Sequence, residues 1–174
     1  VTRGDRVALL LPNTIPCVAA YYAVLKIGAI AVMNNPLYSD RELDHQFNDS
    51  GAKLLVTLDL LGNRMIDLRP KTRIKQIVIT SIGDYLPFPK NWLFPLVAKK
   101  KKLAAEVKPA DDVFSWKAVL ADHQPNPPAV TLGFEDVAMY QYTGGTTGVS
   151  KGVMLTHANL SKNVQQCRAW FPTF

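Results

Sequence analysis

The stretch that decides the fold is Arg6–Met33, RVALLLPNTIPCVAAYYAVLKIGAIAVM. Its continuous apolar run Arg6–Leu11 predicts a strand that is buried on both faces. Asn13 or Thr14 can cap a helix that Gly28 then ends, and a second apolar strand follows directly. Strand, helix and strand in this order, with continuous apolar strands, are typical of a parallel sheet.

The same alternation continues along the chain. Ser39 and Glu42 form a capping-box pattern at the start of a second helix, and Gly51 is its predicted stop. Further predicted elements are the strands Lys53–Leu58 and Gln76–Thr80 and the helix Leu60–Leu68. We therefore expect an α/β fold, a three-layer α/β/α sandwich with a mostly parallel, Rossmann-like sheet.

The residue pattern also predicts which helices are covered. The first helix is apolar almost all round, so we expect it to be buried. Only Leu43 and Phe47 mark an inner face on the second helix, which predicts a surface helix. Cys17 and Cys167 lie in apolar helical contexts, and we expect buried, unpaired thiols in a reducing compartment.

Residues 81–128 break the alternation, because seven prolines fall within them. Inside this irregular insert, Tyr85–Lys102 (YLPFPKNWLFPLVAKKKK) places aromatic side chains beside four consecutive lysines. One interpretation is interfacial membrane contact, in which the lysines meet anionic lipid. The alternative is a long surface connection with solvated lysines. In the membrane interpretation, the apolar side chains that would enter the lipid headgroup region are Phe88, Trp92, Leu93 and Phe94.

Composition limits the function classes. The chain has 174 residues, of which 48% are hydrophobic and 20% charged, as in ordinary globular domains. A net charge of +6 suggests nucleic-acid binding as one hypothesis. No recognition helix or stacking motif accompanies the charge, so we expect no nucleic-acid partner. We see no signal peptide, and the longest apolar run, Ile15–Leu25, is too short to span a membrane. We expect a cytoplasmic protein, with peripheral contact at the inner membrane face through residues 85–102.

A second stretch carries the chemistry: Tyr140–Lys151, YQYTGGTTGVSK. Hydroxyl side chains alternate with glycines whose backbone N–H groups can converge on an anion, and a lysine closes the loop. This composition predicts a phosphate cradle. It is not a Walker loop, because Lys151 is preceded by Ser150 and followed by Gly152. The apolar run Gly152–Thr156 after it predicts that the loop joins two strands.

Tyr140–Lys151 resembles the phosphate-binding signature of the adenylate-forming superfamily, which includes acyl-CoA synthetases, luciferases and peptide-synthetase adenylation domains. Every position of the family pattern is met, and LTHANL (Leu155–Leu160) extends the match. Gly4–Thr57 independently resembles the opening part of these enzymes. The chain looks most like a long-chain-fatty-acid CoA ligase, and both of its ends look like cuts within a longer chain.

The resemblance implies a reaction with two half-reactions. A fatty acid carboxylate attacks the α-phosphorus of ATP to give an acyl-adenylate and pyrophosphate, and the thiol of CoA then displaces AMP. The loop would hold the β- and γ-phosphates with Mg²⁺ present; Thr143 is the hydroxyl implied near the metal, and Lys151 is the implied charge stabiliser. Gly144 stands where many members have Ser or Thr. Implied nucleotide-binding residues are Tyr142, Thr143, Gly144, Gly145, Thr146, Thr147, Gly148, Val149, Ser150, Lys151 and Gly152.

By the same resemblance, residues 1–130 are a first α/β subdomain, and residues 131–174 begin a second one that carries the loop. The adenine site, the acyl pocket and a C-terminal domain would lie beyond Phe174, so we expect this stretch alone to be inactive. The partners implied are fatty acid, ATP and CoA, with a homodimer as a further expectation. Other adenylate-forming enzymes (an aryl-CoA ligase or a peptide-synthetase module) and a non-catalytic phosphate- or lipid-binding module stay open as alternatives. His157 is a candidate acid or base, although histidine is also common at a helix N-terminus.

Overall fold

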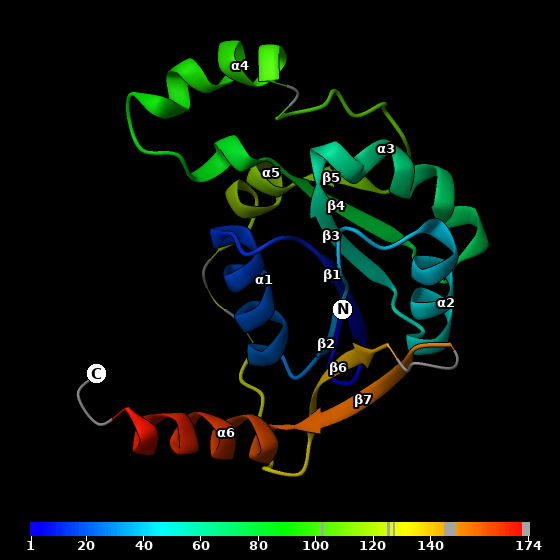
Figure 1. Ribbon diagram of the computed structural model, residues 1–174, viewed down its shortest axis with the longest axis vertical. Coiled ribbons are helices and arrows are strands. Elements are labelled where there is room, and N and C mark those ends of the chain that lie inside the picture. Colours follow the sequence, from blue (N-terminus) through cyan, green and yellow to red (C-terminus); the bar gives the residue numbers. More distant parts are fainter. Residues whose placement is uncertain (102, 125, 127, 145–148, 172–174) are drawn as a thin grey trace.

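The computed structural model describes residues 1–101, 103–124, 126, 128–144 and 149–171, and Figure 1 shows its elements. Within these residues one seven-stranded sheet has the order β5-β4-β3-β1-β2-β6-β7. The strands are β1 (Arg6–Leu10), β2 (Ile30–Met33), β3 (Leu54–Leu58), β4 (Gln76–Thr80), β5 (Val113–Ser115), β6 (Val137–Thr143) and β7 (Lys151–Thr156). Neighbouring strands are parallel except for the antiparallel pair β6–β7, which confirms the predicted, mostly parallel sheet.

Helices cover both faces of the sheet, which confirms the three-layer prediction (Figure 1). Alternate residues of β1 point to opposite faces. Val7 and Leu9 join a core cluster with α1 and α5, whereas Ala8 and Leu10 pack with α2 and α3. The helices are α1 (Ile15–Lys26), α2 (Asp40–Ser50), α3 (Asp59–Leu68), α4 (Lys90–Lys101), α5 (Trp116–Ala121) and α6 (His157–Trp170), with 3₁₀ turns η1 (Arg69–Lys71) and η2 (Ile82–Tyr85).

The helix boundaries follow the predicted signals. Thr14 is the residue that precedes α1, and Gly28 after it has φ +71°, a left-handed conformation that favours glycine. At α2, Ser39 and Glu42 form the full capping box, and Gly51 ends the helix in the left-handed region with φ 64°. The predicted start and stop residues of these two helices are therefore confirmed.

Two burial predictions are wrong. The outer face of α1 is exposed, with Ile15, Val18 and Tyr22 between 56% and 64% accessible, because among the described residues only its sheet-facing side is covered. Cys17 is buried as predicted, but Cys167 is exposed. The cause is the position of α6, which projects from the body in Figure 1 and buries only Ala158. Apolar residues on a helix thus show that a face of it can be buried, but they do not show whether another segment of the chain packs against that face.

The segment 81–128 is more regular than predicted. It contains α4, and it also contributes β5, which pairs in parallel with β4 and extends the sheet. β5 is only three residues long, too short for its periodicity to be recognised in the sequence. Among the described residues, no helix combines the length and the apolar character needed to cross a bilayer. The division into subdomains near residue 130 stays a prediction; β6 and β7 belong to the same sheet as β1–β5.

Candidate functional site

The predicted phosphate loop joins β6 to β7, so it connects two strands as the sequence indicated. In this hairpin Tyr142 lies opposite Gly152, and Thr143 lies opposite Lys151. These two pairs form the stems of the loop. The predictions for the loop's central residues fall outside the described residues, namely Gly145, Thr146, Thr147 and Gly148.

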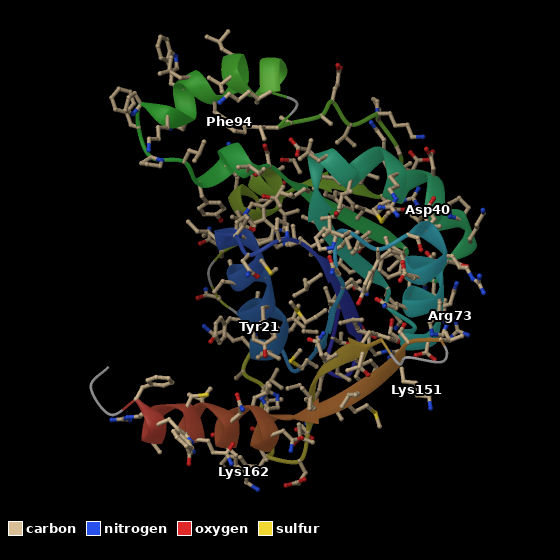
Figure 2. The ribbon with its side chains drawn as sticks, viewed as in Figure 1. Tyr21, Asp40, Arg73, Phe94, Lys151 and Lys162 are labelled. Carbon is tan, nitrogen blue, oxygen red and sulfur yellow. The ribbon has the colours of Figure 1, made fainter. Side chains whose placement is uncertain are left out.

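Thr143 and Lys151 lie at the mouth of the loop, and both are exposed. Residues directly opposite in an antiparallel pair project to the same face, with Cβ atoms about 5 Å apart. A hydroxyl and a cation therefore stand side by side where the chain enters and leaves the loop. Lys151 makes no ion pair within the part of the chain that the structure describes. Figure 2 shows its side chain extending away from the body.

Tyr142 points to the other face of the hairpin and is buried. Its hydroxyl oxygen lies 2.6 Å from Oδ2 of Asp49 and 3.3 Å from the carbonyl oxygen of Gln46, both on α2. Burial, reinforced by the Asp49 carboxylate, raises the pKa of Tyr142 above its usual range. The phenol thus stays protonated at neutral pH and donates a charge-assisted hydrogen bond to Asp49. Gly152 leaves room for the ring, because a Cβ there would lie 3.1 Å from its Cζ atom.

His45 is a site residue that the sequence did not reveal. Its Nε2 atom lies 2.9 Å from the carbonyl oxygen of Ser150, so Nε2 donates the hydrogen bond. The His45 ring also stands edge-on to the ring of Tyr142, with centroids 6.4 Å apart. The only signal in the sequence was the spacing of His45 and Asp49, which places both on one face of a helix.

The space between α2 and the hairpin is an open groove of about 1100 Å³. Residues of α2 line one side of it, while Gly144, Val149 and Ser150 line the other. The groove is therefore bounded by the described ends of the loop, and a phosphate chain bound at the loop would lie next to it.

His157 occupies the first position of α6, at the far end of β7 from the loop (Figure 1). Thr156 and Asn159 form a capping box there, in which each side chain accepts a hydrogen bond from the other's backbone N–H group. His157 comes six positions after Lys151, just past the end of β7, or roughly 20 Å away at 3.3 Å per residue. This position favours a role at the helix start over one in phosphate chemistry.

A Mg²⁺ ion fits this chain only in part. Thr143 can supply one hydroxyl oxygen, but the described residues contain no cluster of three His, Cys, Asp or Glu side chains that could hold a metal ion. Mg²⁺ commonly binds through substrate phosphates, water and one or two carboxylates. Most ligands of such an ion would therefore come from the nucleotide, from water and from residues outside this stretch.

A glycine- and hydroxyl-rich sequence closed by lysine, between two strands at the edge of a mostly parallel α/β sheet, is typical of proteins that bind phosphate groups. The chain belongs to the AMP-binding enzyme family, whose model matches residues 1–173. The family resemblance predicted from Tyr140–Lys151 is therefore confirmed.

The relatives are acyl-CoA ligases. The chain is 42% identical over 172 residues to a long-chain-fatty-acid–CoA ligase of Bacillus subtilis (strain 168), covering 97% of this chain and 30% of that protein. It is 40% identical over 167 residues to the enzyme of the same name from Haemophilus influenzae, covering 95% and 30%. The chain thus spans about 30% of the length of these relatives.

Solved structures agree with this assignment. A long-chain-fatty-acid–CoA ligase from Archaeoglobus fulgidus superposes with a TM-score of 0.72 at 31% identity, covering 97% of this chain and 28% of that one. An anthranilate CoA ligase in complex with anthranoyl-AMP gives 0.75 at 21% identity, covering 95% and 27%, and this similarity shows the fold alone.

Proposed function

We propose that the full-length protein is an ATP-dependent long-chain-fatty-acid CoA ligase. The observation that carries the proposal is the pairing of Thr143 and Lys151 at the mouth of the hairpin loop, in a chain 42% identical to a ligase of that name. A carboxylate acylates thiols poorly at neutral pH. Activation by ATP gives an acyl-adenylate and pyrophosphate, after which the CoA thiol attacks the acyl carbon and AMP leaves.

This chain would serve the first of these steps. Backbone N–H groups of the loop and the ammonium group of Lys151 would hold the β- and γ-phosphates and neutralise the charge that develops as pyrophosphate leaves. Thr143 would direct its hydroxyl to the same phosphates and to a Mg²⁺ ion bound by them. Positioning and charge neutralisation are the main means by which enzymes catalyse phosphoryl-group chemistry, and the hairpin supplies both.

The main alternative is the same chemistry with a different acid. A relative at 29% identity is 4-coumarate–CoA ligase 3 of Arabidopsis thaliana, an aryl-acid enzyme by name. We favour a fatty acid because long-chain-fatty-acid–CoA ligases reach higher identity, from 37% to 42%. A peptide-synthetase module and a non-catalytic binding module have no such support.

The test is an assay of the full-length protein with a panel of acids. We expect exchange of labelled pyrophosphate into ATP that depends on long-chain fatty acids, and acyl-CoA formation when CoA is added. Acids with aromatic rings and free amino acids are the matched controls. Exchange that depends on 4-coumarate and not on fatty acids would establish the alternative, and no exchange with any acid would contradict both.

We also propose that the protein acts at the cytoplasmic face of a membrane, docking through α4 and through Phe88, two residues before the helix. The outer face of α4 carries an apolar stripe at helical spacing, in which Trp92 and Leu96 are each 75% accessible. Phe88, just before the helix, is 84% accessible. Large apolar side chains that gather on a soluble surface mark an interaction site.

The opposite face of α4 anchors the helix to the body. Ala98 is buried, and the ring of Phe94 lies so close to Gly83 of η2 that a Cβ atom at Gly83 would collide with it. Figure 2 labels Phe94 on this helix. The lysines Lys99–Lys102 follow the apolar stripe in sequence. Apolar side chains beside a lysine run are complementary to an anionic lipid surface, where each lysine contributes about 1 kcal/mol at best.

Vesicle binding tests this docking surface. We expect the full-length protein to co-sediment with vesicles that contain phosphatidylglycerol, and to be released by salt. Replacing Lys99–Lys102 together by glutamine should lower the bound fraction by roughly tenfold or more, because several favourable charge contacts are lost. Trp92→Ala should weaken binding even at low salt.

A charge-matched variant is the control for this prediction. It changes four exposed lysines elsewhere to glutamine, namely Lys26, Lys71, Lys75 and Lys162. Loss of binding in this control equal to that in the Lys99–Lys102 variant would show a general charge effect. No binding by the unaltered protein would favour the surface-connection interpretation of this segment.

A further inference from the structure

Helix α2 contacts both stems of the phosphate loop. His45 donates to the carbonyl oxygen of Ser150 at 2.9 Å, and Gln46 Nε2 donates to the hydroxyl oxygen of Ser150 at 3.3 Å. One turn further along the helix, Asp49 accepts the hydrogen bond of Tyr142. Ser150 is the last loop residue before the β7 stem, and Tyr142 lies in the β6 stem, so one helical turn holds the chain on both sides of the loop.

The hairpin needs support from outside. Among the described strands β7 pairs with β6 alone and lies at the edge of the sheet, and all of its residues are partly or fully exposed. β2 pairs with β6 only as far as Gln141, so Tyr142, Thr143 and their partners on β7 form a two-stranded ribbon at the end of the sheet. A two-stranded ribbon is marginally stable in water, so without further contacts the stems would separate or shift in register. Three residues of one helix that bind both stems restrict these motions.

A buried chain of amides reinforces the contact with Ser150. Gln46 is fully buried, and its Oε1 atom accepts a hydrogen bond of 2.7 Å from Nδ2 of Asn34, the residue that follows β2. The Gln46 side chain is therefore fixed at its oxygen and presents its nitrogen to Ser150. Buried hydrogen bonds of this kind position groups more strictly than exposed ones do.

We propose that α2 is a positioning element of the phosphate loop, in which His45, Gln46 and Asp49 act as a clamp on its two stems. The effect on adenylation that we expect rests on the proposed function. The hydrogen bonds by which α2 holds the two stems do not depend on it. The peptide that joins Ser150 to Lys151 is planar, so a fixed Ser150 carbonyl also fixes the direction of the following N–H group. Donors held in place before the reaction stabilise developing charge without the cost of reorganisation.

The decisive comparison is His45→Leu with His45→Gln in the full-length protein. Leucine has no donor, whereas the amide nitrogen of glutamine can take the place of Nε2. Gln46→Met keeps the side-chain length but removes the hydrogen bonds to both Ser150 and Asn34. Asp40→Asn is the matched control, because Asp40 lies on the same helix and its carboxylate pairs with Arg64 of α3, not with the hairpin.

Two readouts separate positioning from general stability: hydrogen exchange of the amides in residues 149–152, and the rate of fatty-acid-dependent adenylation. We expect His45→Leu and Gln46→Met to speed exchange there and to lower the adenylation kcat by roughly tenfold with a smaller change in KM for ATP. His45→Gln should recover most of both, and Asp40→Asn should leave both unchanged.

Unaltered exchange in His45→Leu and Gln46→Met would overturn the clamp, as would equal losses in His45→Gln and His45→Leu. The proposed function fails separately, if the unaltered protein shows no acid-dependent adenylation. In that case the exchange measurement alone still decides whether α2 holds the loop.

Discussion

Replacing Lys151 by alanine is expected to lower the rate of acyl-adenylate formation by about 10²-fold, the scale for loss of one preorganised charge-stabilising donor. Lys151 lies opposite Thr143 at the mouth of the loop and has no ion-pair partner among the described residues, so its charge is available to a ligand. The charge that it would neutralise grows as pyrophosphate departs. The effect should therefore appear mainly in kcat of the first half-reaction, measured as pyrophosphate exchange.

The second half-reaction is the internal control. Formation of the thioester from preformed acyl-adenylate involves no pyrophosphate, so Lys151→Ala should leave it largely intact. Thr143→Ala should slow adenylation less and be partly rescued by more Mg²⁺, because its hydroxyl is one of several oxygens around the metal. Equal losses in both half-reactions would mean that Lys151 organises the whole domain, and would contradict its assignment to the leaving group.

The features that were predictable from the sequence are those that local chemistry determines. β4 begins and ends at the predicted residues Gln76 and Thr80, and β1 and β3 differ from the prediction by one residue at one end. The capping box of Ser39 and the glycine at position 51 set the limits of α2 through their own hydrogen bonds and backbone geometry. The loop between two strands was likewise evident from the apolar runs on either side of it.

Contacts between distant segments were not predictable in the same way. His45 and Ser150 are 105 positions apart, and their hydrogen bond exists only because β6 pairs with β2 and brings the hairpin beside α2. Gln46 looked like a surface residue in a polar helix, yet it is fully buried. Gln46 carries no periodic or motif signal of its own, and His45 has only its helical spacing from Asp49. The function of a polar side chain in such a fold depends on strand order, which periodicity does not specify.

Phe47→Ala is expected to have the largest effect on stability. Phe47 is 1% accessible and packs in the core cluster that joins α2 to the sheet, together with Leu10, Leu43 and Leu55. Removing a buried phenyl ring costs about 3–5 kcal/mol, from the lost burial and from the cavity that remains. Domains are stable by only about 5–15 kcal/mol, so this single change should unfold a large fraction of the molecules under mild denaturant. Chemical denaturation followed by circular dichroism measures the difference.

Val18→Ala is the matched control, since it also removes apolar atoms from a helix but at a site that is 56% accessible. Its effect should stay within about 0.5 kcal/mol. The two variants also distinguish the roles of α2. The core cluster of Phe47 contains no residue of either stem, so Phe47→Ala should reduce activity only in proportion to the folded fraction. His45→Leu should instead reduce activity in molecules that remain folded. A folded Phe47→Ala protein with adenylation as slow as His45→Leu would show that α2 acts on the loop through its packing on the sheet, not through the hydrogen bonds to Ser150.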